Sequence, residues 1–274
     1  SYAKSGNTCD SSMLTSLSSS EDATFDFRLI GKVDLFPEKK YFKDLIKDFN
    51  DFQEIYKNWI VAQDKINLDG KIKLFKTHQG KYTVEGNSFT NNDNTLATIY
   101  IVRDPRNLVQ SISNHYTKSL EDSCEFLLAS KIIGNGKNYE DKQGGLYTLL
   151  GKWNEHYRSW TTNKNNLLII KYEDLIKNPR AQLEKTIDFL KKYLTFETDK
   201  NKINKILETT SFNNLKKLEK EGQFNENTQN KKDGGKVNFF HHGTKNLWHK
   251  NLNEKIVSKI EKNFFIEMKE LGYL

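Results

Sequence analysis

Cysteine, proline and long apolar runs are scarce in this sequence of 274 residues. Cys9 and Cys124 are the only cysteines, which is too few for a disulfide framework and lacks the paired spacing of a zinc site. Such sparing use of cysteine predicts a reducing compartment and a cytoplasmic protein. No run of about 18 apolar residues occurs, so the chain as given is predicted to contain no membrane-spanning helix. No Pro/Gly-rich linker divides the chain, so residues 1–274 are expected to form one domain.

Acidic residues are fewer than basic ones, with 36 Asp and Glu against 43 Lys and Arg, so the formal net charge is +7. An excess of positive charge favours anionic partners. Nucleic acid binding is not predicted, because no zinc-knuckle, basic-zipper or RNP-like pattern occurs, and a small multiply charged anion fits the charge as well. No cluster of His, Cys and carboxylate residues has metal-ligand spacing, so no metal cofactor is expected.

Short apolar runs alternate with helical patterns along the chain. Strands are predicted over 71–76, 96–102 and 167–172. Helices are predicted over 38–66, 105–116, 120–132, 145–161, 179–193 and 253–271. This alternation indicates an α/β fold, a P-loop-like doubly wound parallel sheet flanked by helices, with functional residues at the carboxyl ends of the strands. Residues 222–236 are rich in Asn, Gln, Lys and Gly and are predicted to form a mobile loop.

The chain opens with S-Y-A-K-S-G-N-T, residues 1–8, a segment of small and hydroxyl residues. Before a helix, such a turn offers backbone N–H groups, a lysine and hydroxyls to an anion. The segment lacks the Walker spacing G-x-x-x-x-G-K-[ST], so a nucleotide triphosphatase is not indicated. By itself, the segment is more simply an ordinary strand-to-helix turn with a surface lysine.

A second candidate for anion binding follows the strand predicted over 96–102. The sequence Y-I-V-R-D-P-R-N-L-V-Q-S places Arg103 at the end of this strand and Ser111 two helical turns later, so both could reach one phosphate. Asp104 and Pro105 indicate the start of a helix, as N-cap and first helical residue. On its own, the pattern also fits a surface salt bridge of Arg103 and a solvent-facing Ser111.

Together, the two segments resemble signatures of the cytosolic-type sulfotransferases, which use 3′-phosphoadenosine 5′-phosphosulfate (PAPS). The opening segment resembles the 5′-phosphosulfate loop [TS]-Y-P-K-[SA]-G-[TN]-T-W, and R-D-P-R-N-L-V-Q-S resembles the 3′-phosphate motif, in which a serine follows an arginine by eight residues. Further family marks occur in the expected order along nearly the whole chain: K-T-H at 76–78, W-x-x-H-x-x-x-W at 153–160, Y-E-D at 172–174, T-S-F at 210–212 and F-F-H-H-G-T-K-N-L-W at 239–248, which resembles F-x-R-K-G-x-x-G-x-W.

The resemblance implies sulfuryl transfer from PAPS to a hydroxyl or amine acceptor, by in-line attack with a histidine as general base. It assigns the base to His78, which without the motif is more simply a histidine bonded to backbone, and electrostatic roles to Lys4 and Lys76. Trp153 and Trp160 are expected to be core residues. The resemblance implies nucleotide binding by Lys4, Ser5, Gly6, Asn7, Thr8, Arg103, Ser111, Tyr172, Thr210, Phe212, His241, His242 and Gly243.

The sequence departs from the family pattern at several ligand positions. Ala3 replaces the loop proline, and Cys9 replaces the tryptophan that stacks on adenine, so a contact of about 1–3 kcal/mol is expected to be missing or replaced. His241 and His242 replace Arg-Lys at the 3′-phosphate, so cofactor affinity is expected to rise as the pH falls from about 8 to 6. In related proteins a buried strand precedes the loop, and the first strand is therefore expected to be truncated in this chain.

Two other functions stay open on the sequence alone. A P-loop small-molecule kinase shares the sheet and the anion loop but needs magnesium and a Walker lysine. A catalytically impaired nucleotide-binding relative is suggested by Cys9, His241 and His242. The acceptor is unspecified, and small molecules, glycans and lipids all fit, because acceptor pockets are formed by variable loops. The family's dimerisation motif is not recognisable in residues 248–261, so the oligomeric state stays open.

Overall fold

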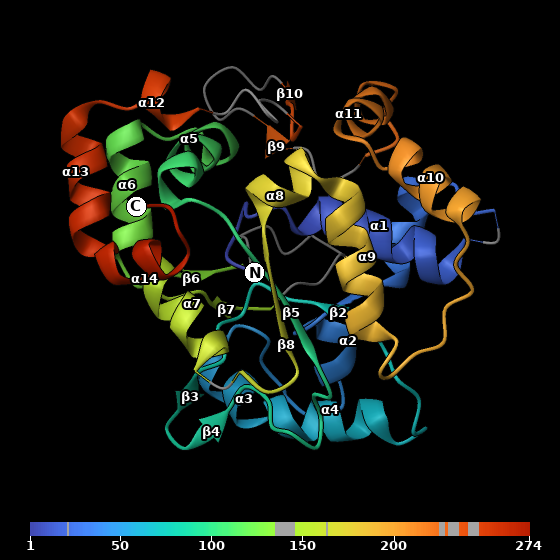
Figure 1. The fold of residues 1–274 in the computed structure, drawn as a ribbon. Helices are drawn as coiled ribbons and strands as arrows, with labels where there is room; N and C mark the ends of the chain where they lie inside the picture. The colour runs from blue at the N-terminus through green and yellow to red at the C-terminus, as the bar shows by residue number, and fades with distance from the viewer. Residues whose placement is uncertain (21, 135–145, 163, 225–227, 230–235, 241–246) are drawn as a thin grey trace. The chain divides into compact units, whose positions relative to one another are not determined.

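A computed structural model describes residues 1–274 except 21, 135–145, 163, 225–227, 230–235 and 241–246 (Figure 1). The chain forms two compact units. Unit 1 comprises Ser1–Ala3, Asp34–Tyr100 and Ala129–Ile169, and unit 2 comprises Lys4–Val33, Ile101–Leu128 and Ile170–Leu274. The boundary between the units therefore divides the opening segment after its third residue.

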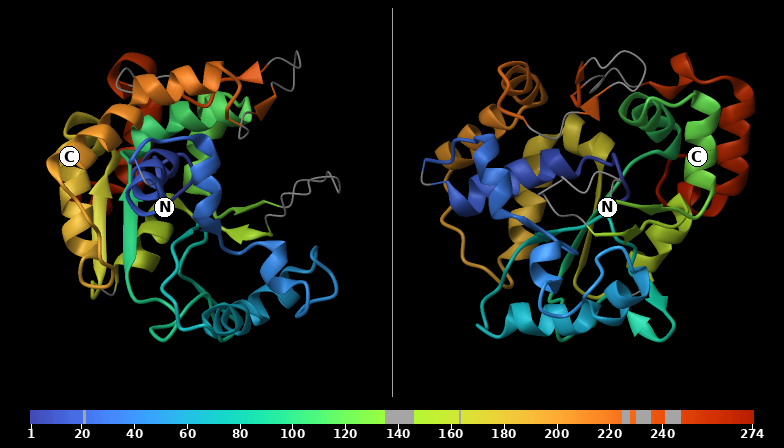
Figure 2. Two further views of the ribbon diagram at one scale, coloured as in Figure 1. Left: turned by 90° about the vertical axis from the view of Figure 1, so that its right-hand side faces the viewer. Right: turned by 180° about the vertical axis from the view of Figure 1, so that it is seen from behind.

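Unit 1 combines pairs of short strands with helices. Its elements are β1 (Asp34–Leu35), α2 (Lys39–Phe42), α3 (Phe52–Lys57), α4 (Trp59–Asn67), β2 (Phe75–Lys76), β3 (Thr83–Val84), β4 (Asn87–Ser88), β6 (Ile132–Ile133), β7 (Thr148–Leu149) and α7 (Trp153–Thr161). β1 and β2 are parallel, whereas β3–β4 and β6–β7 are antiparallel pairs. Helices α3 and α4 lie beside the hairpin β3–β4 (Figures 1 and 2). The core is aromatic, with Phe42, Trp59, Trp153 and Tyr157 almost fully buried.

The single helix predicted over 38–66 is wrong, because the chain forms α2, α3 and α4 there. Asp51 is the N-cap of α3, and its side chain accepts a hydrogen bond from the backbone N–H of Gln53. The carboxylate of Glu54 accepts a hydrogen bond from the backbone N–H of Lys47. Because such side-chain acceptors compete with helical hydrogen bonds, they end one helix and start the next within an otherwise periodic pattern.

Unit 2 is mainly helical. Its elements are α1 (Asn7–Ser19), the 3₁₀ helix η1 (Phe27–Lys32), α5 (Pro105–Tyr116), α6 (Leu120–Leu128), α8 (Tyr172–Lys177), α9 (Pro179–Leu190), α10 (Lys200–Thr209), α11 (Phe212–Lys220), β9 (Thr228–Gln229), β10 (Lys236–Val237), α12 (Trp248–Asn251), α13 (Glu254–Asn263) and α14 (Phe265–Glu270). Helices α5, α6 and α13 pack against one another (Figure 1). β9, which lies in the segment 222–236, forms an antiparallel pair with β10, which starts at the last residue of that segment and ends at Val237.

Helix α5 has the bounds that the sequence predicts, because both of its ends are encoded locally. The Asp104 side chain accepts a hydrogen bond from the N–H of Arg106, Pro105 is the first helical residue, and Thr117 ends the helix in a left-handed conformation. The other predicted helices are shorter in the structure, and the one predicted over 253–271 is divided into α13 and α14.

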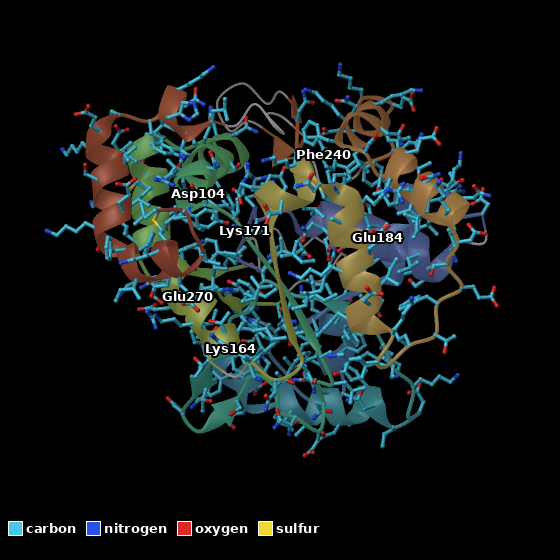
Figure 3. The ribbon with its side chains drawn as sticks, in the orientation of Figure 1. Asp104, Lys164, Lys171, Glu184, Phe240 and Glu270 are labelled. Atoms are coloured by element: carbon cyan, nitrogen blue, oxygen red, sulfur yellow. The ribbon has the colours of Figure 1, made fainter. Side chains whose placement is uncertain are left out.

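Strands β5 (Thr98–Val102) and β8 (Leu167–Lys171) pair with each other, which confirms two of the three predicted strands. Tyr100, Ile101 and Val102 are at most 2% exposed, as expected for an apolar strand covered on both faces. Each strand runs from unit 1 into unit 2. Figure 3 marks Lys171 at the end of β8 and Asp104 shortly after the end of β5, so the predicted motifs follow these strand ends.

Of the strand predicted over 71–76, only β2 is regular. The Asp69 side chain accepts a hydrogen bond from the N–H of Lys71 (3.0 Å), and Gly70 has a φ of 65°, so a turn extends into the first part of the predicted range. Among the described helices, none is long and apolar enough to cross a membrane.

Candidate functional site

The opening loop turns sharply into the first helix of unit 2. Lys4 and Gly6 have left-handed backbone conformations, with φ of 65° and 107°. Gly6 is the N-cap of α1, and its carbonyl accepts hydrogen bonds from the N–H groups of Cys9 and Asp10 (3.1 and 3.2 Å). Left-handed residues beside a helix N-terminus gather backbone N–H groups into a concavity that can bind an anion. Asn7 and Thr8 form the start of this helix and are half-buried.

The loop packs on the tyrosine of the Y-E-D motif. A Cβ atom built on Gly6 would lie 2.3 Å from Cδ2 of Tyr172, so no side chain fits at this position. Tyr172 is the first residue of α8, directly after β8, and it is buried. Burial raises the pKa of its hydroxyl well above the ordinary range, so Tyr172 is neutral at physiological pH.

Arg103 connects the opening loop with the second predicted motif. It follows β5, is 6% exposed, and donates hydrogen bonds from Nη1 to the carbonyl oxygen of Lys4 (3.1 Å) and to Oγ of Ser111 (3.0 Å). Its guanidinium carbon lies 4.2 Å from the centroid of the Tyr172 ring. The structure thus places the carbonyl of Lys4, the hydroxyl of Ser111 and the ring of Tyr172 around the buried guanidinium of Arg103.

Two buried donors of this site, Ser5 Oγ and Arg103 Nε, have no hydrogen-bond partner in the part of the chain that the structure describes. Ser5 is 0% exposed. An unsatisfied buried donor costs about 1–3 kcal/mol, and more when the group is charged. An anionic oxygen would satisfy both donors, so the residues present fit a phosphate-bearing ligand.

The ammonium of Lys4 lies over the aromatic ring of Phe239, which occurs much later in the sequence of unit 2. Its Nζ is 3.4 Å from the centroid of the Phe239 ring, a cation–π contact. The backbone N–H groups of Phe239 and Phe240 donate to the two carboxylate oxygens of Glu219 (2.5 and 3.0 Å). Glu219 is 1% exposed. The sequence analysis missed it, although it follows the buried Leu215 by four residues and so shares the inner face of α11.

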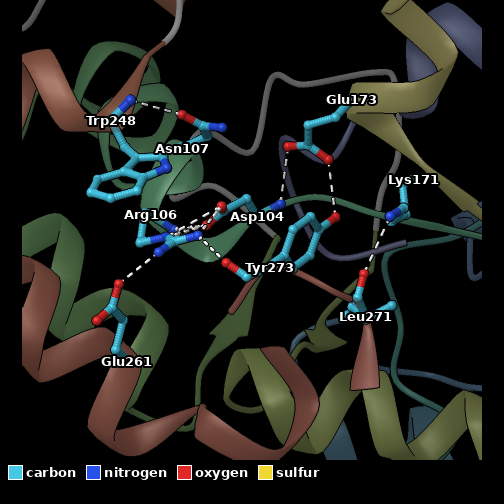
Figure 4. Close-up of polar contacts among 9 residues, drawn as sticks. All are labelled: Asp104, Arg106, Asn107, Lys171, Glu173, Trp248, Glu261, Leu271 and Tyr273. Carbon is cyan, nitrogen blue, oxygen red and sulfur yellow. Dashed lines mark hydrogen bonds and ion pairs between the residues drawn. The ribbon is translucent and has the colours of Figure 1, made fainter. Parts of the chain in front are cut away.

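A further carboxylate holds the beginning of α5 (Figure 4). Glu173 accepts hydrogen bonds from the backbone N–H of Asp104 (3.1 Å) and from the hydroxyl of Tyr273 (2.9 Å). The guanidinium of Arg106 pairs with the carboxylate of Asp104 at 2.7 Å. Asp104 is therefore held through its backbone and its side chain, directly after Arg103. The signal for Glu173 was its place in the Y-E-D motif.

Cys9 and Asp10 are buried in the first turns of α1. Burial raises the pKa of the Cys9 thiol to about 12, so it is protonated and unreactive at neutral pH. Burial also raises the pKa of the Asp10 carboxyl, to about 7. A carboxyl that is partly neutral near pH 7 opposes anion binding at this helix start less than an ionised one would.

Thr210 and Phe212 lie at the junction of α10 and α11. The buried Thr210 hydroxyl donates to the carbonyl of Ile206 (2.7 Å), and the Phe212 ring is perpendicular to that of Phe240, with centroids 5.9 Å apart. Both contacts are made within the protein, so the predicted contacts of Thr210 and Phe212 with adenine stay a prediction. His241, His242 and Gly243 lie outside the described residues.

His78 and Lys76 belong to unit 1. Lys76 is the last residue of β2, paired with Leu35 in the register of β1. His78 is half-buried, and its Nδ1 lies 2.9 Å from the carbonyl oxygen of Ser1. Since a carbonyl oxygen only accepts hydrogen bonds, Nδ1 carries the proton and a neutral ring has its lone pair on Nε2. The bond of His78 to backbone and the catalytic assignment are thus compatible.

Trp153 and Trp160 are both buried, which confirms that they are core residues. Among the described residues, no group of three or more His, Cys, Asp or Glu side chains is placed to hold a metal ion.

Comparison with known proteins agrees with these motifs. The sulfotransferase domain family matches residues 1–272, and the chain belongs to this family. It is 25% identical to cytosolic sulfotransferase 5 of Arabidopsis thaliana over 205 residues, which cover 72% of this chain and 58% of that protein. It is 31% identical to a 3-beta-hydroxysteroid sulfotransferase of Cavia porcellus over 128 residues, 44% of this chain and 39% of that protein. The matches thus span about half the length of these relatives, or less.

Solved structures share the fold of this chain. Retinol dehydratase in complex with androsterone and the inactive cofactor PAP matches with a TM-score of 0.61 at 19% identity, over 98% of this chain and 79% of that one. Mouse sulfotransferase SULT7A1 complexed with PAP matches with a TM-score of 0.55 at 18% identity, over 98% of this chain and 82% of that one. The predicted α/β, P-loop-like fold class is confirmed.

Proposed function

We propose that this chain moves a sulfuryl group from PAPS to a hydroxyl or amine acceptor. The observation that carries the proposal is the position of Arg103. Its guanidinium donates both to Ser111 and to the carbonyl of Lys4, 99 residues away in sequence. Two motifs that each suit an anion therefore meet at one buried cation. A nucleotide with phosphates at both its 5′ and 3′ positions is a ligand that uses both motifs.

The proposed binding groups divide by the part of the nucleotide that they hold. We assign the 5′-phosphate to Lys4, Ser5, Gly6, Asn7 and Thr8, the 3′-phosphate to Arg103, Ser111, His241, His242 and Gly243, and the adenine to Tyr172, Thr210 and Phe212. The orphaned donors on Ser5 and Arg103 support the phosphate assignments. The close packing of Gly6 on Tyr172 supports a role of this tyrosine in shaping the loop as well.

In the proposed reaction, the acceptor attacks sulfur in line while the bond from sulfur to the bridging phosphate oxygen breaks, and the electron pair leaves with that oxygen. His78 takes the acceptor's proton on Nε2, because Nδ1–H is directed to the Ser1 carbonyl. Lys4 stabilises the negative charge that develops on the leaving oxygen, and Lys76 the sulfuryl oxygens. PAPS supplies the activated sulfuryl group.

The test is turnover of sulfur-labelled PAPS with a panel of acceptors. We expect His78→Ala to lower kcat to background while the affinity for PAP, the desulfated product, measured by calorimetry, stays within about threefold, because no phosphate contact is lost. Lys4→Ala should lower both kcat and PAP affinity. His249→Ala, which removes an exposed histidine on α12, is the matched control. Near-normal turnover of His78→Ala would remove the base assignment.

We propose small hydroxyl or amine compounds as acceptors, because relatives are named as a 3-beta-hydroxysteroid sulfotransferase and an amine sulfotransferase. Glycans and lipids belong in the panel as further classes. A kinase function is not favoured. It would require that magnesium-ATP binds to this chain and competes with PAP, which the same calorimetry measures. We also propose that residues 1–274 act as one sulfotransferase domain, supported by the match over 1–272, and that its location is cytoplasmic, supported by the name of the plant relative.

A further inference from the structure

Helix α7 in unit 1 is hydrogen-bonded to the segment that carries His78. The Nε2 atom of His156 lies 3.1 Å from the carbonyl oxygen of His78, and the indole N–H of Trp160 donates to the carbonyl of Gln79 (3.0 Å). Ser159 Oγ accepts a hydrogen bond from a backbone N–H of the same segment, two residues after Gln79 (3.0 Å). Positions 156, 159 and 160 are spaced i, i+3 and i+4, so they lie on one face of the helix.

The protonation state of His156 follows from its two partners. Its Nε2 faces a carbonyl oxygen, which only accepts, so Nε2 carries the proton. Its Nδ1 must then accept, and the hydroxyl of Tyr100 lies 2.8 Å away as the donor. His156 is 0% exposed, and burial lowers its pKa well below the usual range, so the ring stays neutral. The Tyr100 hydroxyl is buried as well, and burial raises its pKa, so it remains a donor.

These contacts fix His78 at two points. The backbone is held at its carbonyl by His156, and the imidazole is held at Nδ1 by the carbonyl of Ser1. The direction of a side chain depends on the backbone angles at its own residue. If the backbone carbonyl of His78 lost this hydrogen bond, the backbone angles of His78 could change and its imidazole could turn away from its present orientation. His156 is also in edge contact with the ring of Tyr2, whose centroid is 5.5 Å away, so the same histidine packs on the opening segment.

We propose that His156 is a positioning residue for the reaction: its Nε2–H holds the backbone of His78, and the Tyr100 hydroxyl holds His156 in the tautomer that can donate. The proposal rests on the proposed function of His78 as the general base. His156 does not take part in the proton transfer. Under this proposal, the W-x-x-H-x-x-x-W motif supplies the scaffold of the base through its histidine and its second tryptophan.

Two amide variants separate this role from simple core packing. His156→Gln places an amide near the position of Nε2 and can still donate to the His78 carbonyl. His156→Asn places its amide near the position of Nδ1 and cannot reach that carbonyl. We expect Asn to lower kcat on the order of 10- to 100-fold, with KM for PAPS within about threefold, and Gln to restore most of kcat. Thr161→Val, which removes a hydroxyl bonded within the same helix, should leave kcat unchanged.

Equal losses of kcat in the Gln and Asn variants would overturn the proposal, since only packing would then matter. A second readout needs no turnover: nitrogen-15 spectra of the wild-type histidines should show His156 as the Nε2–H tautomer, with no titration between about pH 5 and 9. An Nδ1–H tautomer, or titration in this range, would overturn it as well. If PAPS is not turned over but the spectra agree, the hydrogen bond stands and the function of His78 as base fails.

Discussion

Gly6 occupies a position that excludes a side chain for two independent reasons. Its φ of 107° is costly for any residue with a Cβ atom, and a Cβ would also meet the ring of Tyr172 at 2.3 Å. The Tyr172 ring is buried and lies against Arg103, so it cannot move aside without disturbing that contact. The lack of a side chain at Gly6 thereby allows the loop to pack on the Tyr172 ring, which in turn contacts the guanidinium of Arg103.

We expect Gly6→Ala to lower PAP affinity by at least about tenfold and to lower the melting temperature, because both the backbone and the Tyr172 ring must shift. Calorimetric titration with PAP and thermal unfolding measure the two effects. Gly31→Ala is the control, because a Cβ there meets no atom within 4 Å. Binding of PAP by Gly6→Ala with wild-type affinity would show that the loop does not hold the nucleotide.

Helix α11 acts as an anchor for the chain that follows it. Both carboxylate oxygens of Glu219 accept backbone N–H groups, those of Phe239 and Phe240, and the Phe239 ring lies on the Lys4 ammonium. One buried carboxylate on this helix thus fixes the residues that directly precede His241, His242 and Gly243. This element therefore connects the opening loop with the chain leading to the proposed 3′-phosphate groups.

At this element we expect Glu219→Gln to reduce the free energy of unfolding by about 1–3 kcal/mol. The amide replaces one of the two carboxylate oxygens by an NH₂ group, so one of the two backbone N–H groups loses its acceptor. PAP affinity should fall as well. Urea unfolding and calorimetry measure these changes, and Glu221→Gln, an exposed position just after the same helix, serves for comparison. A Glu219→Gln variant as stable as Glu221→Gln would contradict the anchoring role.

The two units carry different parts of the proposed reaction. The described candidates for phosphate binding belong to unit 2; they are Lys4, Ser5, Gly6, Asn7, Thr8, Arg103 and Ser111. His78, Lys76 and the positioning residue His156 belong to unit 1. Nucleotide binding and proton transfer are therefore expected to respond to different substitutions.

Hydrogen exchange of the whole chain tests this division. PAP should slow amide exchange in residues 4–8 and at the starts of α5 and α8, and should leave α3, α4 and the β3–β4 hairpin of unit 1 unchanged. His78→Ala should keep this pattern, and Arg103→Ala should lose it, because only the second variant removes a proposed phosphate contact. Protection concentrated in α3 and α4 would place the nucleotide elsewhere.

Helix starts and strands of this protein could be predicted from the sequence where they depend on interactions between residues close in the chain. The start of α5 follows from Asp104 and Pro105, and the apolar runs predicted the strands β5 and β8, because capping and periodicity act over a few residues. The same reasoning overestimated the helix at 38–66, where side chains such as Asp51 and Glu54 compete for backbone groups. The motifs identified most candidate groups because they combine residue type with spacing.

By itself, the sequence determined the family, the class of fold and the candidate groups for anion binding and proton transfer. Only the tertiary structure decided which groups meet: Arg103 with the Lys4 carbonyl, Glu219 with Phe239, and His156 with the His78 carbonyl. The reason is physical. Each of these hydrogen bonds joins backbone to a side chain distant in sequence, and backbone N–H and C=O groups are the same at every residue, so no residue type marks the partner until the chain has packed.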